Sequence, residues 1–305
     1  MLFGTCYYPE FWDHHLWREH ARLMADAGMN VVRLADFAWS SLEPSEGQFD
    51  FDWLDEAIRA MDEAGLRVIL CTPTAAPPRW LARKKDILMR DRYGRVREWG
   101  SRRACCANNE TYRLASDRIV TALAEHYRGD PRIVAWQIDN ELGCHGTTVC
   151  YCESCKRRFQ SWLADSYGSI RELNRRWGTV FWSQTYDSFE DVILPAYNSC
   201  EPENSRRFSH NPSLDMEFMR FSSESWVAFA ARQAQILRQA NPQVQITTNL
   251  MGHFADIDYF RLMQTMDFVS WDNHPQTQWE LRGYVWTSMA HEIMRGIKDQ
   301  NFIVM

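Results

Sequence analysis

Two stretches of the sequence repeat one pattern, in which a helix ends at a glycine and a short apolar strand follows. Residues 24–34 and 61–70 both carry it, with Gly28 and Gly65 at the junctions. Glycine is favoured just after a helix because that position often needs a left-handed backbone. Successive strands joined through such helices pair in parallel by right-handed crossovers. The repeat therefore predicts an α/β fold with a parallel sheet.

The same pattern along the rest of the chain predicts seven strands with helices between them. The strands are expected at residues 2–7, 30–35, 67–72, 133–138, 244–249, 266–271 and 302–305. Two of the helices are expected over residues 111–127 and 214–239. Seven strand–helix units are typical of a (β/α)8 TIM barrel, whose catalytic side chains lie on the loops after the strands. A doubly wound open sheet is the alternative.

The seventh expected strand coincides with the end of the sequence at Met305. We therefore expect residues 1–305 to form one catalytic (β/α)8 barrel domain that is incomplete and stops before its eighth unit. The missing unit would leave two unpaired sheet edges beside a gap.

The charge and hydropathy of the chain exclude several classes of protein. Its formal net charge of -6 argues against a surface that binds nucleic acid. No run of 18 apolar residues occurs, so no membrane-spanning helix is predicted. The first residues do not have the charged and apolar regions of a secretory signal. We therefore expect a cytoplasmic protein.

The cysteines are unevenly spaced along the chain. There are nine, and three of them fall within residues 150–155. An odd number without an export signal does not fit a disulfide framework. Closely spaced thiols suit Zn²⁺, which takes four ligands in structural sites. The fourth ligand is expected from a preceding loop, as Cys105 or Cys106, and buried free thiols or a zinc-ribbon module are the alternatives.

The apolar strand expected at residues 133–138 leads directly into Asn140 and Glu141. A carboxyl group at the end of a buried strand is held by a rigid element. Partial removal from water favours its protonated form and suits it to donate a proton. Asn140 offers a donor and an acceptor to a substrate hydroxyl. The alternative is an ordinary capping pair on a strand-to-helix loop.

Several stretches together resemble glycoside hydrolase family 42, a family of β-galactosidases. The matching stretches are 7–12, 33–39, 43–51, 136–145, the cysteine loop at 150–155, and 269–273. Members of this family have a (β/α)8 catalytic barrel, with an acid/base after the fourth strand and a nucleophile at the seventh. The resemblance implies a retaining glycoside hydrolase that cleaves terminal non-reducing β-D-galactosides.

The resemblance also implies roles for individual residues. Glu141 matches the acid/base, and Asn140 and Arg103 match substrate-binding residues, although Arg103 could instead be a surface charge. Trp182 resembles an aromatic residue that lines the pocket of a neighbouring subunit, with core packing as the alternative. Members are commonly trimers, so a homotrimer is expected of the full-length form. The residues that match structural zinc ligands are Cys106, Cys150, Cys152 and Cys155.

Two departures from the family pattern affect the expected activity. The family nucleophile directly follows a strand that resembles residues 302–305, so this glutamate is absent from the sequence. We therefore expect residues 1–305 by themselves to turn over galactosides poorly or not at all. Asp36 and Asp272 are poor substitutes, and Glu43 is interpreted as structural. His274 stands where related sequences often have a tyrosine.

Two other functions are compatible with these residues. An α-L-arabinopyranosidase or another clan-related glycosidase would use the same acid/base, because arabinopyranose differs from galactose chiefly at one hydroxymethyl group. A non-catalytic carbohydrate-binding remnant would keep the pocket without the nucleophile.

Overall fold

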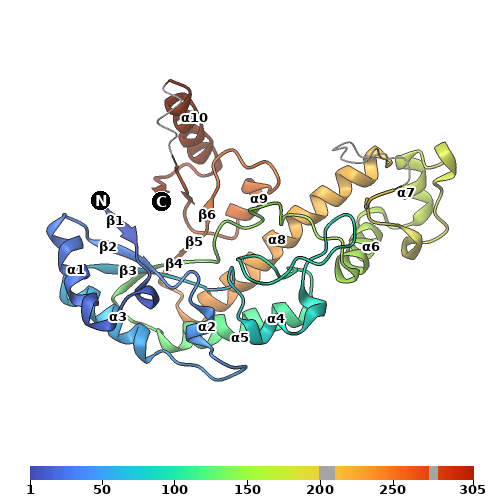
Figure 1. Ribbon diagram of the computed structural model, residues 1–305. Coiled ribbons are helices and arrows are strands. Elements are labelled where there is room, and N and C mark those ends of the chain that lie inside the picture. The colour runs from blue at the N-terminus through green and yellow to red at the C-terminus, as the bar shows by residue number, and fades with distance from the viewer. Residues whose placement is uncertain (199–209, 275–280) are drawn as a thin grey trace.

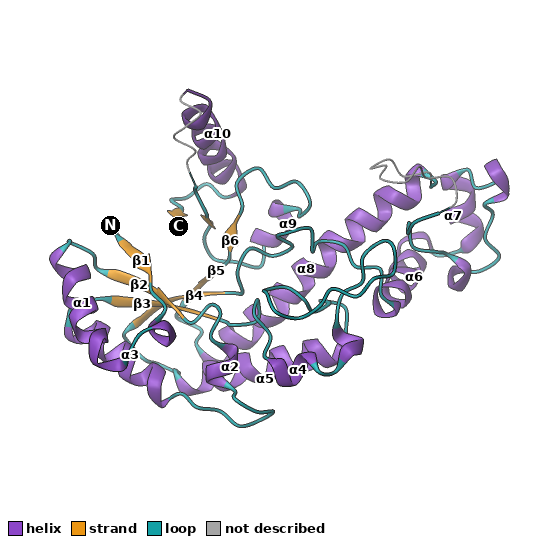
Figure 2. Cartoon of the chain, viewed as in Figure 1, coloured by secondary structure: helices purple, strands orange, loops and turns teal. Residues whose placement is uncertain are grey.

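The computed structural model describes residues 1–198, 210–274 and 281–305. All strands in these ranges pair in parallel, and they form two sheets of order β1-β2-β3-β4-β5 and β6-β7-β8 (Figures 1 and 2). The strands are β1 Gly4–Cys6, β2 Val31–Leu34, β3 Arg67–Cys71, β4 Ile133–Gln137, β5 Gln245–Thr247, β6 Asn249–Leu250, β7 Ser270–Trp271 and β8 Ile303–Val304.

The two sheets are continuous, because β5 and β6 together occupy one strand position. Only Thr248 separates β5 from β6, and β5 pairs with β4 while β6 pairs with β7. The chain therefore has seven successive parallel strand positions, as the sequence predicted. Within the described ranges, β1 and β8 each pair with a strand on one side only. The architecture is an α/β barrel that is incomplete after the seventh strand.

The sixth predicted strand is shorter than expected. Residues 266–271 were predicted to be extended, whereas only Ser270–Trp271 form a regular ladder. Asp267 explains the difference, because its carboxylate accepts a hydrogen bond from Ile246 N at 2.8 Å and its own N–H donates to Ile246 O at 2.8 Å. A side chain thus replaces part of the ladder at this point.

Helices cover the outer side of the curved sheet (Figure 1). The predicted helix at 111–127 is α5, which begins one residue earlier because Asn109 Oδ1 caps it by accepting from Tyr112 N at 3.2 Å. The predicted helix at 214–239 is α8, which Asn211 caps in the same way through Ser213 N. The helices are α1 Trp17–Asp26, α2 Trp39–Leu42, α3 Asp52–Glu63, α4 Arg79–Ala82, α5 Glu110–His126, α6 Glu153–Tyr167, α7 Ile170–Trp177, α8 Pro212–Ala240, α9 Tyr259–Met263 and α10 Leu281–Ile297.

The structure has two large hydrophobic cores. The first lies between the sheet and its covering helices and includes Leu34, Ile58 and Trp136. The second lies farther along α8, where α6 and α7 pack around Phe159 and Phe218. The assignment of residues 1–305 to one catalytic domain stays a prediction. None of the helices in the described ranges is both long enough and apolar enough to cross a membrane.

Glu43 has the structural role that the sequence suggested. Its side chain is fully buried and accepts hydrogen bonds from Trp39 Nε1 at 2.8 Å, from Gly47 N at 2.8 Å and from Arg118 Nε at 2.9 Å. These three donors satisfy the carboxylate and tie the loop after β2 to α5. Glu43 is therefore bound up in the scaffold.

Candidate active site

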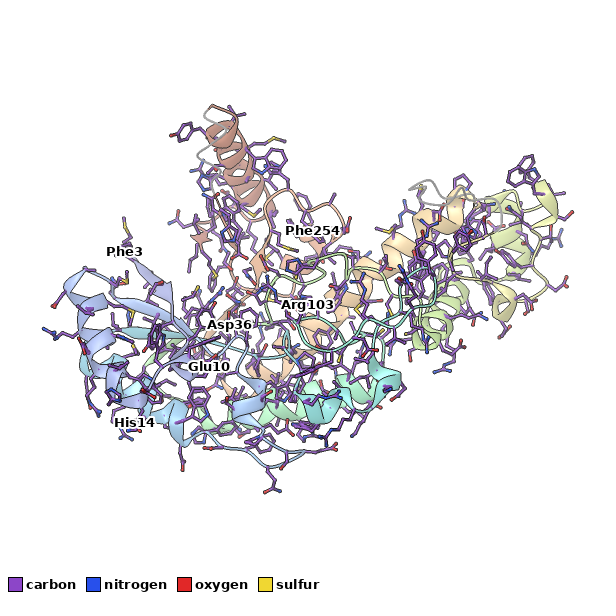
Figure 3. All side chains as sticks on the ribbon, in the orientation of Figure 1. Phe3, Glu10, His14, Asp36, Arg103 and Phe254 are labelled. Carbon is purple, nitrogen blue, oxygen red and sulfur yellow. The ribbon has the colours of Figure 1, made fainter. Side chains whose placement is uncertain are left out.

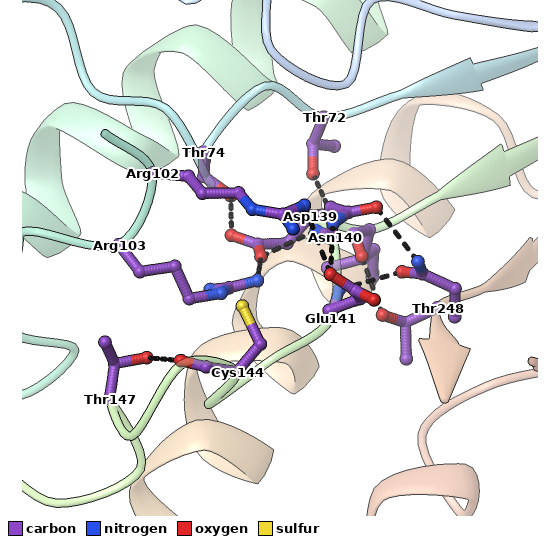
Figure 4. Close-up of polar contacts among 12 residues, drawn as sticks. Thr72, Thr74, Arg102, Arg103, Asp139, Asn140, Glu141, Cys144, Thr147 and Thr248 are labelled. Carbon is purple, nitrogen blue, oxygen red and sulfur yellow. Dashed lines mark hydrogen bonds and ion pairs between the residues drawn. The ribbon is translucent and has the colours of Figure 1, made fainter. Parts of the chain in front are cut away.

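Glu141 lies just beyond the C-terminal end of β4, where the backbone makes a tight, unusual turn (Figure 4). Asp139 and Glu141 have φ values of 55° and 47°. Non-glycine residues keep such left-handed conformations only where their surroundings hold them. Here Asp139 N donates to Thr72 Oγ1 at 2.8 Å, and Glu141 N donates to Asn249 Oδ1 at 2.9 Å. The turn directs a partly exposed carboxyl group, with 15% of its side chain accessible, to the rim of the sheet.

Asn249 connects three strand ends through its side-chain amide. Its Oδ1 accepts from Glu141 N, and its Nδ2 donates to Asn140 Oδ1 at 2.9 Å and to Asp272 Oδ2 at 2.7 Å. Gln137 Nε2 also reaches Asn249 Oδ1, at 3.3 Å. These contacts orient the amide of Asn140 so that its Nδ2 faces Glu141 Oε2 at 3.2 Å. The structure thus brings the predicted pair of Asn140 and Glu141 together.

Arg102 is the arginine that contacts Glu141. Its Nη1 lies 3.1 Å from Glu141 Oε2, and its Nη2 lies 3.0 Å from His145 Nε2. About 30% of its side chain is exposed, so the guanidinium is accessible from the rim. Glu141, Cys144 and His145 each have one potential metal-binding atom within 4.8 Å of the other two. The Arg102 cation contacts two of these residues, Glu141 and His145.

Arg103 is placed differently from its neighbour. Its side chain is almost fully buried, it pairs with Asp139, and its guanidinium lies 5.3 Å from the ring centre of Trp226. Asp139 accepts a further hydrogen bond from Thr74 Oγ1 at 2.5 Å. Figure 3 marks Arg103 near the middle of the molecule, and Figure 4 shows its guanidinium directed at Asp139. The Arg103 guanidinium is thus turned toward Asp139, and its contact with the substrate stays a prediction.

Asp272 brings a second carboxyl group to the site from the end of β7. Burial and the nearby negative charge of Glu141 raise the pKa of Asp272 from 3.8 to about 7, against the opposing effect of Arg33. A buried carboxyl beside another carboxylate is expected to hold its proton in this way. Asp272 is thus a group that changes charge near neutral pH within this site.

The four predicted zinc ligands form one buried cluster. The sulfur atoms of Cys106, Cys150, Cys152 and Cys155 all lie within 4.8 Å of one another. The Cys106 and Cys155 sulfurs are 3.3 Å apart, and those of Cys152 and Cys106 are 3.6 Å apart. Cys105 lies outside this group, in the first hydrophobic core. Cys106, and not Cys105, therefore lies in the cluster with the three cysteines of residues 150–155.

Backbone and side-chain amides surround these sulfur atoms. Arg90 N donates to Cys150 Sγ at 3.4 Å, and Asn108 N donates to Cys106 Sγ at 3.4 Å. Asn108 Nδ2 lies 3.3 Å from Cys155 Sγ. Such donors stabilise thiolates, the form in which cysteine binds a metal. The donor set can hold a soft cation.

Trp182 lies on the turn after α7, whereas Glu141 follows β4, and Figure 1 shows α7 and β4 far apart. The Trp182 side chain is 68% exposed and stacks on Phe181, with the ring centres 5.0 Å apart. Val180 and Phe181 are also exposed. The alternative of core packing is wrong, because the indole projects from the surface.

Sequence reasoning missed Arg102 and Asn249 and set Asp272 aside. Asn249 ends a predicted strand, as Glu141 follows one, so its place at the same rim was a usable signal. Arg102 and Arg103 form a doublet, and the sequence alone does not reveal which of the two faces the site. The φ of 65° at Arg103 is what separates the directions of the two side chains.

The family model for β-galactosidases of glycoside hydrolase family 42 matches residues 6–305. The chain belongs to this family. Family 42 relatives include the β-galactosidase BgaH of Haloferax lucentense, 42% identical over the whole chain and 47% of that protein. A β-galactosidase of Thermus thermophilus is 46% identical over 90% of the chain and 41% of that protein.

A solved β-galactosidase structure has the same backbone arrangement. The β-galactosidase of Halorubrum lacusprofundi matches with a TM-score of 0.93 and 40% identity, over 100% of this chain and 47% of that one. This structural similarity agrees with the α/β barrel described above. The chain spans about half the length of the curated family 42 relatives that it matches.

The raised pKa of Asp272 predicts a pH-dependent stability difference. Between about pH 4 and pH 7 the folded protein keeps a proton on Asp272 that the unfolded chain releases. The wild type therefore loses stability as the pH rises through this window. Asp272→Asn has no such proton to lose, so its stability relative to the wild type should be higher at pH 8 than at pH 5. Urea unfolding midpoints at both pH values measure this difference.

The control for this comparison is Asp13→Asn, which changes an exposed aspartate. Its stability relative to the wild type should be the same at pH 5 and pH 8. An Asp272→Asn difference that is equally unchanged with pH would contradict the assignment.

Proposed function

We propose that the whole protein is a retaining glycoside hydrolase that removes terminal non-reducing β-D-galactosyl groups. The observation that carries this proposal is the position of Glu141, in a family 42 chain, at the end of β4 and in contact with Arg102 and Asn140. Active sites of barrel enzymes are built at this end of the strands.

The proposed mechanism uses Glu141 twice. It first gives its proton to the glycosidic oxygen while a second carboxylate attacks the anomeric carbon, so that the aglycone leaves and a covalent glycosyl-enzyme forms. Glu141, now a carboxylate, then takes a proton from water, and the resulting hydroxyl displaces the enzyme carboxylate. This retaining reaction needs the two carboxyl groups about 5–5.5 Å apart.

We propose that the nucleophile directly follows β8, as the family resemblance implies. The backbone of Met305 is tied to β7, since its N–H donates to Trp271 O at 2.8 Å and its O accepts from Asn273 N at 3.0 Å. Arg33 Nη1 lies 3.3 Å from Met305 Sδ and 3.0 Å from Gln137 Oε1. A residue after Met305 would therefore start close to Asp272 and to the network around Asn249.

We propose that Asn140 and Arg102 contact the sugar and that Arg103 supports the site indirectly. Asn140 would bond a ring hydroxyl, because Asn249 fixes the direction of its amide. Arg102 would contact the substrate directly. Arg103 would act from behind, by holding Asp139 and thereby the turn that carries Glu141. His274, two residues after Asp272, is exposed.

Replacement of Glu141 by alanine tests the proposed reaction. On lactose, kcat of the whole protein should fall by about 10²–10⁴-fold, the usual contribution of a general acid/base. Sodium azide should restore turnover of an aryl β-galactoside and yield β-galactosyl azide, because azide can attack the glycosyl-enzyme without a general base. Assays with an aryl α-L-arabinopyranoside, run in parallel, show which sugar is preferred.

The matched control is Glu125→Ala, which removes an exposed glutamate near the end of α5 and should leave kcat unchanged. Ordinary lactose turnover by the Glu141→Ala protein, with no effect of azide, would contradict the proposed role of Glu141 as the acid/base. Absence of turnover in the wild type would favour a non-catalytic carbohydrate-binding protein.

We further propose that Cys106, Cys150, Cys152 and Cys155 hold a structural Zn²⁺ ion. Four thiolates at about 2.3 Å from a tetrahedral ion would lie about 3.8 Å apart, and the sulfur separations of 3.3 and 3.6 Å are close to that value. Four sulfur ligands close the coordination shell, so the ion would brace the loop between Glu141 and α6. A cytoplasmic location, which cell fractionation would test, fits thiols kept reduced for this purpose.

Loss of one ligand should release the metal. Cys152→Ser should lower the zinc content from about one ion per chain to near zero by atomic absorption, and it should also lower the melting temperature. Cys105→Ala, one residue from Cys106 but outside the cluster, should keep its zinc. Equal zinc in both variants would contradict the assignment.

We propose that Trp182 completes the pocket of a neighbouring copy in a homotrimer. An indole 68% exposed beside exposed Val180 and Phe181 forms an apolar surface of the kind that subunit contacts cover. Aromatic rings also pack against sugar rings. The wide separation of α7, which precedes Trp182, from β4, which precedes Glu141, agrees with a contribution to another subunit (Figure 1).

Trp182→Ala should therefore raise KM for the galactoside in the whole protein, whereas Trp182→Phe should keep most of the affinity. Sedimentation velocity should detect a trimer in the wild type. A monomer with an unchanged KM in Trp182→Ala would show that the indole does not serve a neighbouring site.

A further inference from the structure

A cavity lies away from the candidate active site, between the start of α5 and the facing sides of α6 and α8. Its volume is about 420 Å³, within the range of small-molecule pockets. The polar side chains that line it include Asn108, Arg113, Arg158 and Ser225, and Trp162 and Phe221 add apolar surface. None of the residues assigned above to sugar binding or proton transfer lines it.

Arg113 is a buried cation without a carboxylate partner. Only 7% of the residue is exposed, its Nε has no hydrogen-bond acceptor, and its Nη1 has one long contact, to Ala107 O at 3.5 Å. Burial and the neighbouring Arg158 and Arg232 lower the pKa of Arg113, against the opposing charges of Glu110 and Asp117. A buried charge left unpaired is costly. The site therefore needs an anion.

Glu110 is exposed and acts on Arg113 through its charge, but the two form no ion pair among the described residues. Glu224 and Asp117 are engaged by other donors. Both oxygens of Glu224 are occupied, since Oε1 accepts from Arg261 Nη1 at 2.6 Å and Oε2 accepts from Trp162 Nε1 at 2.7 Å. Asp117 accepts from Arg232 Nε at 2.6 Å.

Asp165 is the remaining carboxylate of the lining, and it is exposed at the rim. Among the residues that the structure describes, neither Arg113 nor Arg158 takes part in an ion pair. Two arginines, the buried Arg113 and the exposed Arg158, thus line the cavity without a carboxylate partner.

We propose that this cavity binds the phosphate group of a small organic phosphate. Arginine presents its N–H groups in a planar fork that matches phosphate oxygens, and two such groups line the same space. The volume exceeds what a bare phosphate ion fills, so the rest of the ligand would lie against Trp162 and Phe221. The site is separate from the galactoside site and does not depend on the proposed activity.

Asn108 connects this cavity to the cysteine cluster. Its Nδ2 donates to Ser225 Oγ at 3.0 Å and to Cys155 Sγ at 3.3 Å, and Asn108 itself lines the cavity. An occupied cavity would hold Asn108 and α8 in this arrangement. The bound ligand therefore stabilises the part of the chain that carries the four cysteines.

Calorimetric titration of the whole protein with galactose 1-phosphate, at constant ionic strength, tests the proposal. Inorganic phosphate forms a second arm, and galactose a third. Because each hydrogen bond to a charged group contributes about 1.5–3 kcal/mol, Arg158→Gln should weaken phosphate-ester binding by about tenfold or more. Arg113→Lys should weaken it as well, since lysine keeps the charge and loses the fork.

Arg157→Gln is the matched control, because Arg157 precedes Arg158 on α6, is exposed and lies outside the cavity lining. It should bind like the wild type. Tighter binding of the ester than of inorganic phosphate supports the organic ligand. Binding that is absent, equal in Arg157→Gln and Arg158→Gln, or reproduced by galactose alone overturns the proposal.

Discussion

The geometry of the site depends on one amide side chain. Asn249 accepts from the backbone of Glu141 and donates to Asn140 and Asp272, so it joins the ends of β4, β6 and β7. Each of these bonds is buried or partly buried, where an unsatisfied polar group is costly. The bonds compensate for the left-handed backbone at Glu141. The position of the proton donor thus follows from the pairing of the strands.

The sheet makes this arrangement possible because β5 and β6 share one strand position. Thr248 interrupts this strand position. Before Thr248 the chain pairs with β4, and after Thr248 it pairs with β7 on the opposite side. Thr248 Oγ1 donates to Ile138 O at 2.8 Å, which holds the break against β4. The barrel curves at this point, and Asn249 follows directly.

Much of the fold could be predicted from sequence because apolar runs bounded by turns are local signals. All seven strand positions and both helices α5 and α8 were found in this way, with ends displaced by one or two residues except at β7, which begins four residues later than predicted. The cysteine cluster was equally visible, since three of its members lie within residues 150–155. The choice of Cys106 over Cys105 needed the family resemblance.

The side-chain directions at the site could not be predicted, because they depend on backbone angles and on contacts between distant strands. The positive φ of Arg103 buries that residue against Asp139 and leaves Arg102 to reach Glu141. The length of β7 depends on Asp267, whose carboxylate competes for Ile246 N. Neither effect leaves a periodic pattern in the sequence.

The two hydrophobic cores have a consequence for how the molecule opens. The core of α6 and α7 is packed around its own aromatic side chains, and α8 runs through both cores (Figure 2). Regions with separate packing exchange their amide protons as separate cooperative units. The region of α6 and α7 can therefore unfold locally and refold while the strands stay paired. Such a local fluctuation leaves the pairing of the strands, and the position of the candidate active site, unchanged.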